Sequence, residues 1–475
     1  AALPQILRKS GVHYFMTTKL AWNDTDEIPF DSFQWQGIDG SKVLTHLINT
    51  VSEGYAPTPW FATYNGMLNA RVVKKSWDRY KQRQQSDEIL LAYGYGDGGG
   101  GPTFGMIETM QRLENHVWGM PLVKSATALD FFQALDRDAE RKPLPTWLGE
   151  LYFEFHRGTY TSIAKNKQNN RRAENTLQTV EKLFSTYAPA DYPADTLHRL
   201  WQTTLLDQFH DVLPGSAIEA VYQQTDKNYA QLFTALSATE EKFAATQLTP
   251  AVDRLVLYNP AGLAADLETT IALPPDKTVQ AAHGQPVRVQ HLAGEQALIQ
   301  LPQAAPLALQ ELQIVPGQAA SQPRQPEPLD GHYATDDLQI TFDAAFNIVG
   351  LYDKQAQREV LPAGGQFNRL MVYADYPREY DAWNIDADYR RQSWPVDHVV
   401  TAEVTDRGPI RDTLHIVRQF NQSTIEQWLH LYHGTTRIAF TTRLDWHDHP
   451  ALLRTLFDVA VNAPPPDFAI SLCHV

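Results

Sequence analysis

A glycine-rich run that carries one carboxylate is the part of the sequence best suited to do chemistry. It reads Tyr93-Gly94-Tyr95-Gly96-Asp97-Gly98-Gly99-Gly100-Gly101-Pro102-Thr103. Residues 88–93 before it are apolar enough to predict a short strand, and residues 106–118 have helical spacing. Asp97 would then lie at the carboxyl end of a strand, where α/β folds build their active sites, and glycines allow the backbone to approach a ligand closely. A phosphate-binding loop is the competing interpretation, but the Gly-Lys-Ser/Thr ending is missing.

A second polar run spans residues 149–162. Its charged and polar side chains alternate with apolar neighbours, which predicts a half-buried extended segment with one polar wall. These side chains are Glu150, Glu154, His156, Arg157 and Tyr160. An ion-paired segment beneath a domain junction explains the same pattern equally well, because structural networks also gather charged residues.

A third run, residues 206–216, places His210 and Asp211 at a bend between two predicted helices. A neutral imidazole is the commonest metal ligand, and a helix end lets it point toward a neighbouring domain. A lone histidine near a helix end is more often a cap or a packed residue, so this pair does not make a metal site by itself. For His447-Asp448-His449 we favour a structural turn, since Pro450 follows and no third ligand is near in sequence.

Three zones of different periodicity organise the chain. Up to about residue 135, helical patterns (3–9 and 60–85) alternate with strand patterns (12–18 and 43–48), which is an α/β layout. Residues 145–250 are almost wholly helical, with predicted helices at 166–187, 195–209 and 217–247. After Pro250 the period becomes two, which is typical of antiparallel β-sandwiches. The predicted strands there are 254–258, 267–273, 338–342, 414–420 and 438–444.

These zones predict four domains. Residues 1–140 would be part of an α/β domain, 141–250 a helical bundle, 251–322 a small β domain and 323–475 a larger β-sandwich. The boundary between the two β domains falls in a stretch with linker composition, Pro316 to Pro328.

The charge and cysteine content of the chain limit its classes of binding partner and its cellular compartment. The 475 residues carry 55 acidic and 40 basic side chains, a net charge of −15 that argues against nucleic acid as a partner. Cys473 is the one cysteine, so neither an intrachain disulfide nor a thiolate zinc cluster can form, and a reducing cytoplasm fits best. We find neither an apolar run that could cross a membrane nor a signal peptide. The sequence is also compatible with a homo-oligomer.

The three runs, together with residues 14–24 and 33–41, resemble glycoside hydrolase family 38, the α-mannosidases, in particular its bacterial cytosolic type. The motifs occur in the family's order up to about residue 225, and Tyr380-Asp381-Ala382-Trp383-Asn384-Ile385-Asp386 resembles a further motif of its β region. The resemblance implies a partial α/β barrel, a three-helix bundle and β-sandwich domains. It also implies a zinc-dependent retaining α-mannosidase that acts on mannose-containing oligosaccharides.

In such a mechanism one carboxylate attacks the anomeric carbon while another carboxylic acid protonates the leaving oxygen. The resemblance assigns Asp97 as this general acid and base, and His210 as a zinc ligand. It assigns the remaining site residues to substrate binding. These are Lys19, Trp22, His156, Tyr160 and Asp211.

The family's nucleophile and its other zinc ligands, a His-x-Asp pair and the nucleophilic Asp itself, would precede Ala1. We therefore expect a sequence truncated at both ends, which by itself binds zinc poorly and lacks retaining catalysis. Two other functions remain open. One is a noncatalytic carbohydrate-binding protein, which the β-sandwich half and the missing nucleophile favour. The other is a different zinc hydrolase, such as an amidase.

Overall fold

The computed structural model describes residues 2–249, 251–281, 286–317 and 325–461, and the backbone of 469–470 and 473–474. The chain divides into two compact units. The first unit holds residues 2–157 with the short paired strands β23 (Ala469–Ile470) and β24 (Cys473–His474), and the second holds residues 158–461. Among the described residues, none of the helices combines the length and the apolar character that crossing a bilayer requires.

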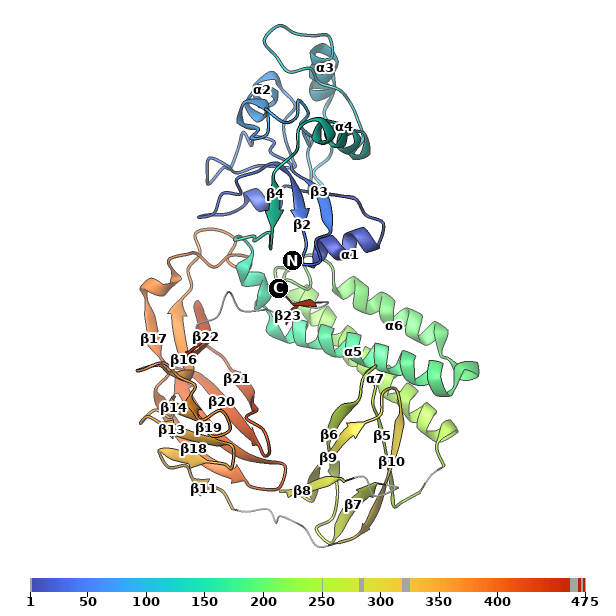
Figure 1. The fold of residues 1–475 in the computed structure, drawn as a ribbon, viewed down its shortest axis with the longest axis vertical. Helices are drawn as coiled ribbons and strands as arrows, with labels where there is room; N and C mark the ends of the chain where they lie inside the picture. Colours follow the sequence, from blue (N-terminus) through green and yellow to red (C-terminus); the bar gives the residue numbers. More distant parts are fainter. Residues whose placement is uncertain are drawn as a thin grey trace. The chain divides into compact units, whose positions relative to one another are not determined.

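The first unit is built around a mixed four-stranded sheet (Figure 1). The strand order is β1 (Tyr14–Thr17), β3 (Lys42–Leu47), β2 (Ser32–Gln36), β4 (Thr146–Leu148). The β1–β3 and β2–β4 pairs are parallel, and β2–β3 is antiparallel. The helical segments of this unit are α1 (Leu3–Lys9), η1 (Lys19–Ala21), α2 (Ala70–Arg79), α3 (Phe104–Leu113) and α4 (Ala128–Arg141).

Side-chain caps set the beginnings of the helices around this sheet. Asn69 accepts a hydrogen bond from the backbone of Val72 at the start of α2, and Thr103 does the same from Met106 at the start of α3. A reciprocal capping box of Thr127 and Asp130 starts α4. The buried face of α4 then packs on the sheet through one apolar cluster. Its members are Leu44, Phe131, Phe132, Leu135 and Leu144.

Three predictions for the first unit differ from the structure. Residues 88–93 do not form a strand: Tyr93 makes one isolated parallel bridge to Gly66, while the nearby backbone N–H groups of Leu90 and Ala92 donate to side chains. The helix predicted for 60–85 covers only 70–79, because the chain is still irregular at Gly66 and the cap at Asn69 starts the helix late. The helix after the glycine-rich run also ends earlier than predicted, at Leu113.

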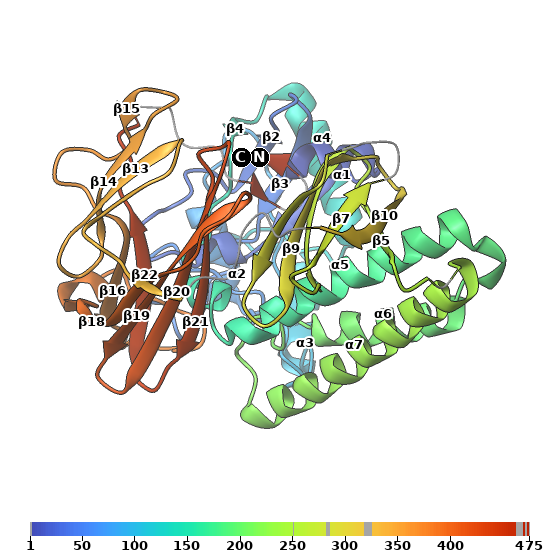
Figure 2. The same cartoon turned by 90° about the horizontal axis from the view of Figure 1, so that it is seen from below.

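The second unit begins with three long helices that lie side by side (Figure 2). They are α5 (Ala164–Tyr187), α6 (Ala194–Asp207) and α7 (Glu219–Gln247), with η2 (Arg157–Tyr160) before α5 and η3 (Pro189–Asp191) before α6. Each begins and ends within two residues of its predicted bounds. Their facing sides share one apolar core, which includes Leu177, Leu197 and Leu232.

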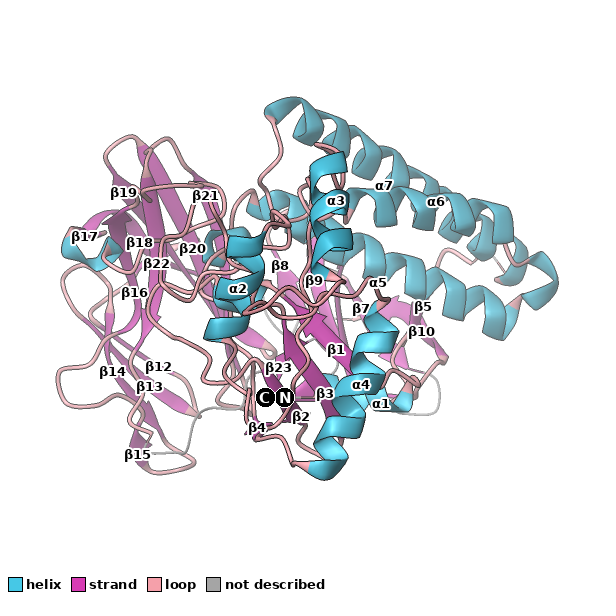
Figure 3. Ribbon diagram, turned by 90° about the horizontal axis from the view of Figure 1, so that it is seen from above, coloured by secondary structure: helices cyan, strands magenta, loops and turns pink. Residues whose placement is uncertain are grey.

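The rest of the second unit is β structure, as the period of two predicted (Figure 3). Two three-stranded sheets enclose the core around Leu273 and Ile299. Their orders are β5 (Arg254–Tyr258), β10 (Leu309–Pro316), β7 (Lys277–Ala281), and β6 (Ala265–Ala272), β9 (Gln296–Ala304), β8 (Arg288–Leu292).

Two larger sheets follow and bury a second core between them, which includes Ile340, Leu414 and Leu429. One has the order β11 (Glu327–Pro328), β18 (His398–Asp406), β19 (Arg411–Phe420), β20 (Ser423–Tyr432), β21 (Ile438–Asp445). The other has the order β12 (His332–Ala334), β13 (Leu338–Phe342), β14 (Ile348–Asp353), β16 (Phe367–Ala374), β17 (Ser393–Pro395). Two further strands pair with this sheet, β15 (Arg358–Glu359) with β14 and β22 (Ala451–Phe457) with β16. The short helix η5 (Tyr389–Arg391) precedes β17. The architecture is thus mixed α/β with several sheets. The partial α/β barrel and the three-helix bundle that the resemblance implies stay predictions.

Candidate active site

The glycine-rich loop holds Asp97 in a left-handed backbone conformation, with φ of +54°. The loop closes on itself through a hydrogen bond from Tyr95 N to Gly101 O at 3.1 Å. Gly96 has no room for a side chain, because a Cβ there would lie 2.1 Å from Asn65 Oδ1. Strained positions of this kind persist where the surrounding structure enforces them, and they cluster at functional sites.

Two consecutive residues hold the carboxylate of Asp97. The Tyr64 hydroxyl donates to Oδ1 at 2.9 Å, and the Asn65 amide Nδ2 donates to Oδ2 at 3.1 Å. The carboxylate is otherwise exposed, so it remains open to a ligand. Sequence reasoning missed both partners. An aromatic and an amide before Gly66 are too common a combination to be singled out without the fold.

Aromatic rings extend the site from Asp97 toward the other predicted residues of the first unit. The Trp22 ring stacks on Tyr64 with a centroid distance of 6.1 Å and on Phe61 at 5.5 Å. The Lys19 ammonium lies 3.5 Å from the Trp22 ring centroid and 4.8 Å from that of Tyr64, which are cation–π contacts. The His156 ring meets Trp22 edge-on at 5.9 Å. The structure therefore brings Lys19, Trp22, His156 and Asp97 together around Tyr64.

Glu154, in the second polar run, has a structural role. Its side chain is 3% exposed and accepts hydrogen bonds from the backbone of Asp24, Thr25 and Asp26 and from the Thr25 hydroxyl, at 2.5 to 2.9 Å. Burial by itself would raise the pKa of Glu154, but these donors outweigh it, and the pKa lies below its usual 4.5. The run forms no strand, and its end is the short helix η2, so the predicted extended segment does not reach Arg157 and Tyr160. The alternative, a structural network, fits Glu154.

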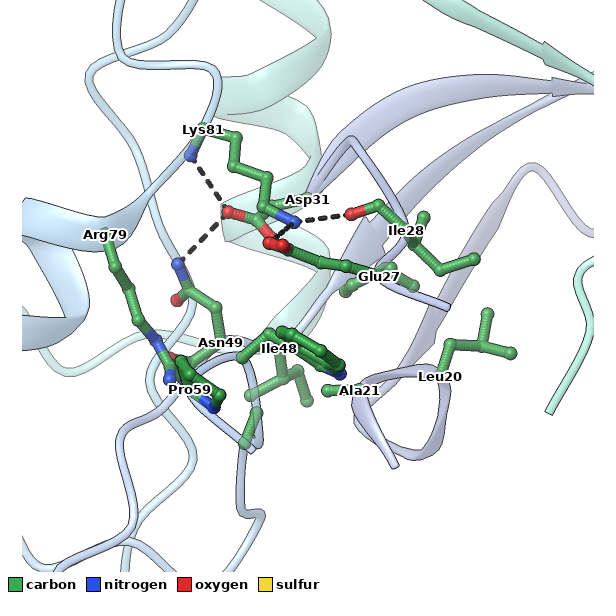
Figure 4. Close-up of a pocket in the computed structure, with 13 residues that line it drawn as sticks. Leu20, Ala21, Glu27, Ile28, Asp31, Ile48, Asn49, Pro59, Arg79 and Lys81 are labelled. Carbon is green, nitrogen blue, oxygen red and sulfur yellow. Dashed lines mark hydrogen bonds and ion pairs between the residues drawn. The ribbon is translucent and has the colours of Figure 1, made fainter. Parts of the chain in front are cut away.

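A cavity of about 140 Å³ is lined by residues from the segments that carry Trp22 and Phe61, among them Ala21 and Ala62 (Figure 4). Asp31 Oδ2 accepts hydrogen bonds there from the Lys81 backbone N–H and from Asn49. Burial raises the pKa of Asp31, although the Lys81 hydrogen bond and the nearby cations oppose the rise. Arg79 donates to the backbone carbonyls of Asn49 and Phe61. These charged groups thus support the segment on which the Trp22 ring rests.

In the second unit, three sequence motifs converge on one another. Gly158 N donates to Trp383 O at 2.8 Å and Ser162 Oγ to Ala382 O at 2.9 Å, which ties the second polar run to the 380–386 motif. Gly215, in the third run, packs so closely on Ser162 that a Cβ would lie 2.4 Å from the Ser162 carbonyl oxygen. Tyr160 lies in this region and is 77% exposed.

His210 follows the end of α6 in a turn, and its side chain is 74% exposed. Its Nε2 lies 3.5 Å from Asp211 Oδ2, and Asp211 Oδ1 accepts from the Ser216 hydroxyl. An imidazole beside a carboxylate suits zinc, which normally needs at least three protein ligands. Within the described ranges, no group of three His, Cys, Asp or Glu side chains could hold a metal. The residues described here therefore do not form a zinc site by themselves.

Three protein-family profiles match the chain in the order of its domains. Residues 1–150 match the glycosyl hydrolases family 38 N-terminal domain, residues 154–246 the alpha mannosidase middle domain, and residues 334–471 the glycosyl hydrolases family 38 C-terminal domain.

Curated relatives and solved structures agree with these profiles. The whole chain is 29% identical to alpha-mannosidase G of Dictyostelium discoideum and to alpha-mannosidase 2C1 of Homo sapiens, and it spans 46% and 44% of their lengths. It is 40% identical over 46% of its length to an alpha-mannosidase of Saccharomyces cerevisiae, covering 20% of that protein. The crystal structure of an alpha-mannosidase from Enterococcus faecalis shares the fold over 96% of the chain and 61% of its own, with a TM-score of 0.68 at 15% identity. The chain belongs to glycosyl hydrolase family 38.

Proposed function

We propose that the chain is part of a retaining α-mannosidase that releases terminal α-linked mannose from oligosaccharides, with Asp97 as its general acid and base. The observation that carries this proposal is the exposed Asp97 carboxylate, held between Tyr64 and Asn65 in a loop where glycines flank it on both sides. A leaving sugar can approach such a loop closely. Membership of the family and the names of the relatives support the substrate class.

In the first step, the protonated Asp97 gives its proton to the glycosidic oxygen as the bond to the anomeric carbon breaks, and the bonding electrons go to that oxygen. A second carboxylate attacks the anomeric carbon and forms a glycosyl-enzyme. In the second step, the Asp97 carboxylate takes a proton from water, and the resulting hydroxide displaces the second carboxylate. By the resemblance, we place this second carboxylate outside residues 1–475.

Lys19 is the first-unit residue best placed to bind a sugar hydroxyl. Its ammonium lies over the Trp22 and Tyr64 rings, and these contacts hold it next to the residue that donates to Asp97. Trp22 already contacts Phe61, Tyr64, His156 and Lys19. We therefore propose that Trp22 acts mainly by holding Lys19. His156, at the edge of the Trp22 ring, lines the same region.

We also propose that His210 is a zinc ligand. Asp211 and Tyr160 are the proposed sugar-binding residues of the second unit. A bound zinc would act as a Lewis acid and a template for adjacent sugar hydroxyls. The described donors do not complete a site, so no step above depends on the metal. Zinc content after purification without added metal, in the wild type and in His210→Ala, tests whether His210 is a ligand. A cytoplasmic location is proposed from the single cysteine.

The test of the function is mannose release from an aryl α-mannoside by the natural full-length protein that contains this chain. We expect turnover that chelators abolish and that Asp97→Asn lowers by about 10²- to 10⁴-fold. A folded, zinc-loaded protein that binds mannosides without turnover would overturn the proposal in favour of a carbohydrate-binding protein. Amide hydrolysis that requires His210 but not Asp97 would favour a different zinc hydrolase.

A further inference from the structure

We propose that Tyr64 and Asn65 are positioning residues that fix the two carboxylate oxygens of Asp97 for proton transfer to the leaving group. This inference rests on the proposed general-acid role of Asp97. Each residue donates to a different oxygen, at 2.9 Å from the Tyr64 hydroxyl and 3.1 Å from Asn65 Nδ2. Rotation of the carboxylate about its terminal bond would break both bonds.

The two donors stand on a rigid base. Asn65 N donates to the Thr63 hydroxyl at 3.0 Å, and Thr63 N donates to Thr50 O at 2.9 Å. On the other side, Gly94 N donates to Gly66 O at 2.9 Å, which joins the base to the start of the glycine-rich loop. The donors and the loop that carries Asp97 therefore belong to one hydrogen-bonded network.

The shape of the loop supports the same positioning role independently. Gly96 leaves the space that the Asn65 amide fills, because a Cβ at this position would lie 2.1 Å from Asn65 Oδ1. Asp97 itself adopts φ of +54°, a left-handed conformation that residues with a side chain rarely adopt. The loop thus accepts local strain at the residue that Tyr64 and Asn65 hold.

The two donors differ in what they can do when Asp97 changes charge. An amide NH₂ can only donate, so Asn65 keeps Oδ2 as an acceptor in both charge states. A hydroxyl can donate or accept, so Tyr64 can stay bonded to Oδ1 in either charge state and leaves the acid proton for the glycosidic oxygen. Oδ1 therefore keeps Tyr64 as a hydrogen-bond partner during proton transfer, while Asn65 holds Oδ2 in place.

Tyr64→Phe and Asn65→Ala test this with aryl α-mannosides whose leaving groups differ in acidity, in the natural full-length protein. Tyr64→Phe keeps the ring that contacts Trp22 and Lys19 and removes only the hydroxyl. For a poor leaving group we expect kcat to fall about tenfold or more in both variants, with KM nearly unchanged. For a dinitrophenyl leaving group, which hardly needs acid catalysis, the fall should be less than about threefold. Tyr95→Phe, on the exposed part of the same loop, is the matched control.

Equal losses on both leaving groups would indicate a merely structural role and overturn the inference, as would wild-type rates in both variants. If the wild type itself shows no mannosidase activity, the proposed function fails, and crystal structures test the positioning separately. We then expect both bonds in the wild type and a rotated Asp97 carboxylate in each variant. An unchanged carboxylate in both variants would refute the positioning role.

Discussion

Asp97 and Glu154 are two carboxylates of the same unit, and the structure treats them in opposite ways. Glu154 is buried and accepts four hydrogen bonds, three of them from consecutive backbone N–H groups. Asp97 is exposed and accepts two, both from side chains, on a strained loop of glycines. A carboxylate that accepts four hydrogen bonds, three of them from the backbone, is stabilised in its ionised form, whereas one held by two side chains stays accessible to a ligand.

The difference teaches how polar residues of similar appearance separate into structural and chemical roles. Glu154 ties residues 24–26 to the segment before η2, and Asn23 completes the link by accepting from Glu154 N at 2.6 Å. This segment leads directly to His156, which contacts Trp22. Glu154 therefore supports the aromatic part of the site, while Asp97 faces outward. Four experiments would sharpen or break this division.

The largest effect should come from Glu154→Ala. It leaves three backbone N–H groups and a hydroxyl without their acceptor, and we expect the free energy of unfolding to fall by about 3 kcal/mol. Urea denaturation, followed by tryptophan fluorescence, measures it. Glu150→Ala, at an exposed position of the same run, should change stability by less than about 0.5 kcal/mol. Equal effects in the two variants would refute the structural role.

The pH dependence of stability should also show the structural role of Glu154. Because the pKa of Glu154 is lower in the folded state than its usual 4.5, its contribution to stability is fully present above that value. The contribution is lost as the pH falls through the folded-state pKa. Between pH 6 and 3.5, the stability of the wild type should therefore fall more steeply than that of Glu154→Gln. Parallel curves would show that Glu154 gains nothing from its donors.

Gly96→Ala should act on the site more than on the fold. The added Cβ would push the Asn65 amide away, and since this is the end of a side chain, we expect less than about 1 kcal/mol of lost stability. Turnover of mannosides with poor leaving groups should fall as in Asn65→Ala. Gly101→Ala, where a Cβ meets no atom within 4 Å, is the control. A variant with full activity would contradict the tight packing of Asn65 against the loop.

The smallest effect should be that of Asp97→Asn on stability, in contrast to its effect on turnover. The side chain is exposed, and asparagine tolerates the left-handed conformation, so we expect a change within about 0.5 kcal/mol. Thermal unfolding of the variant beside the wild type measures it. A loss as large as that of Glu154→Ala would mean that Asp97 is also a structural carboxylate.

Local patterns predicted much of the fold and part of the site. The helices α5, α6 and α7 and strands such as β5 (254–258) and β13 (338–342) follow the apolar period, because each buries one continuous face. The glycines around Asp97 identified the loop. The strand predicted at 88–93 does not form because the backbone N–H groups of Leu90 and Ala92 donate to the side chains of His46 and Thr50 rather than to a neighbouring strand.

The sequence by itself determined which residue types are available: a carboxylate among glycines, a Lys19 near Trp22, a histidine after a helix, and the motifs that resemble family 38. Tertiary structure decided which of them meet. Tyr64 and Asn65 lie more than 30 positions from Asp97, and Glu154 lies about 130 from the residues that bond it. Such pairs form only when distant segments pack together, because hydrogen bonds reach about 3 Å and leave no periodic trace in the sequence.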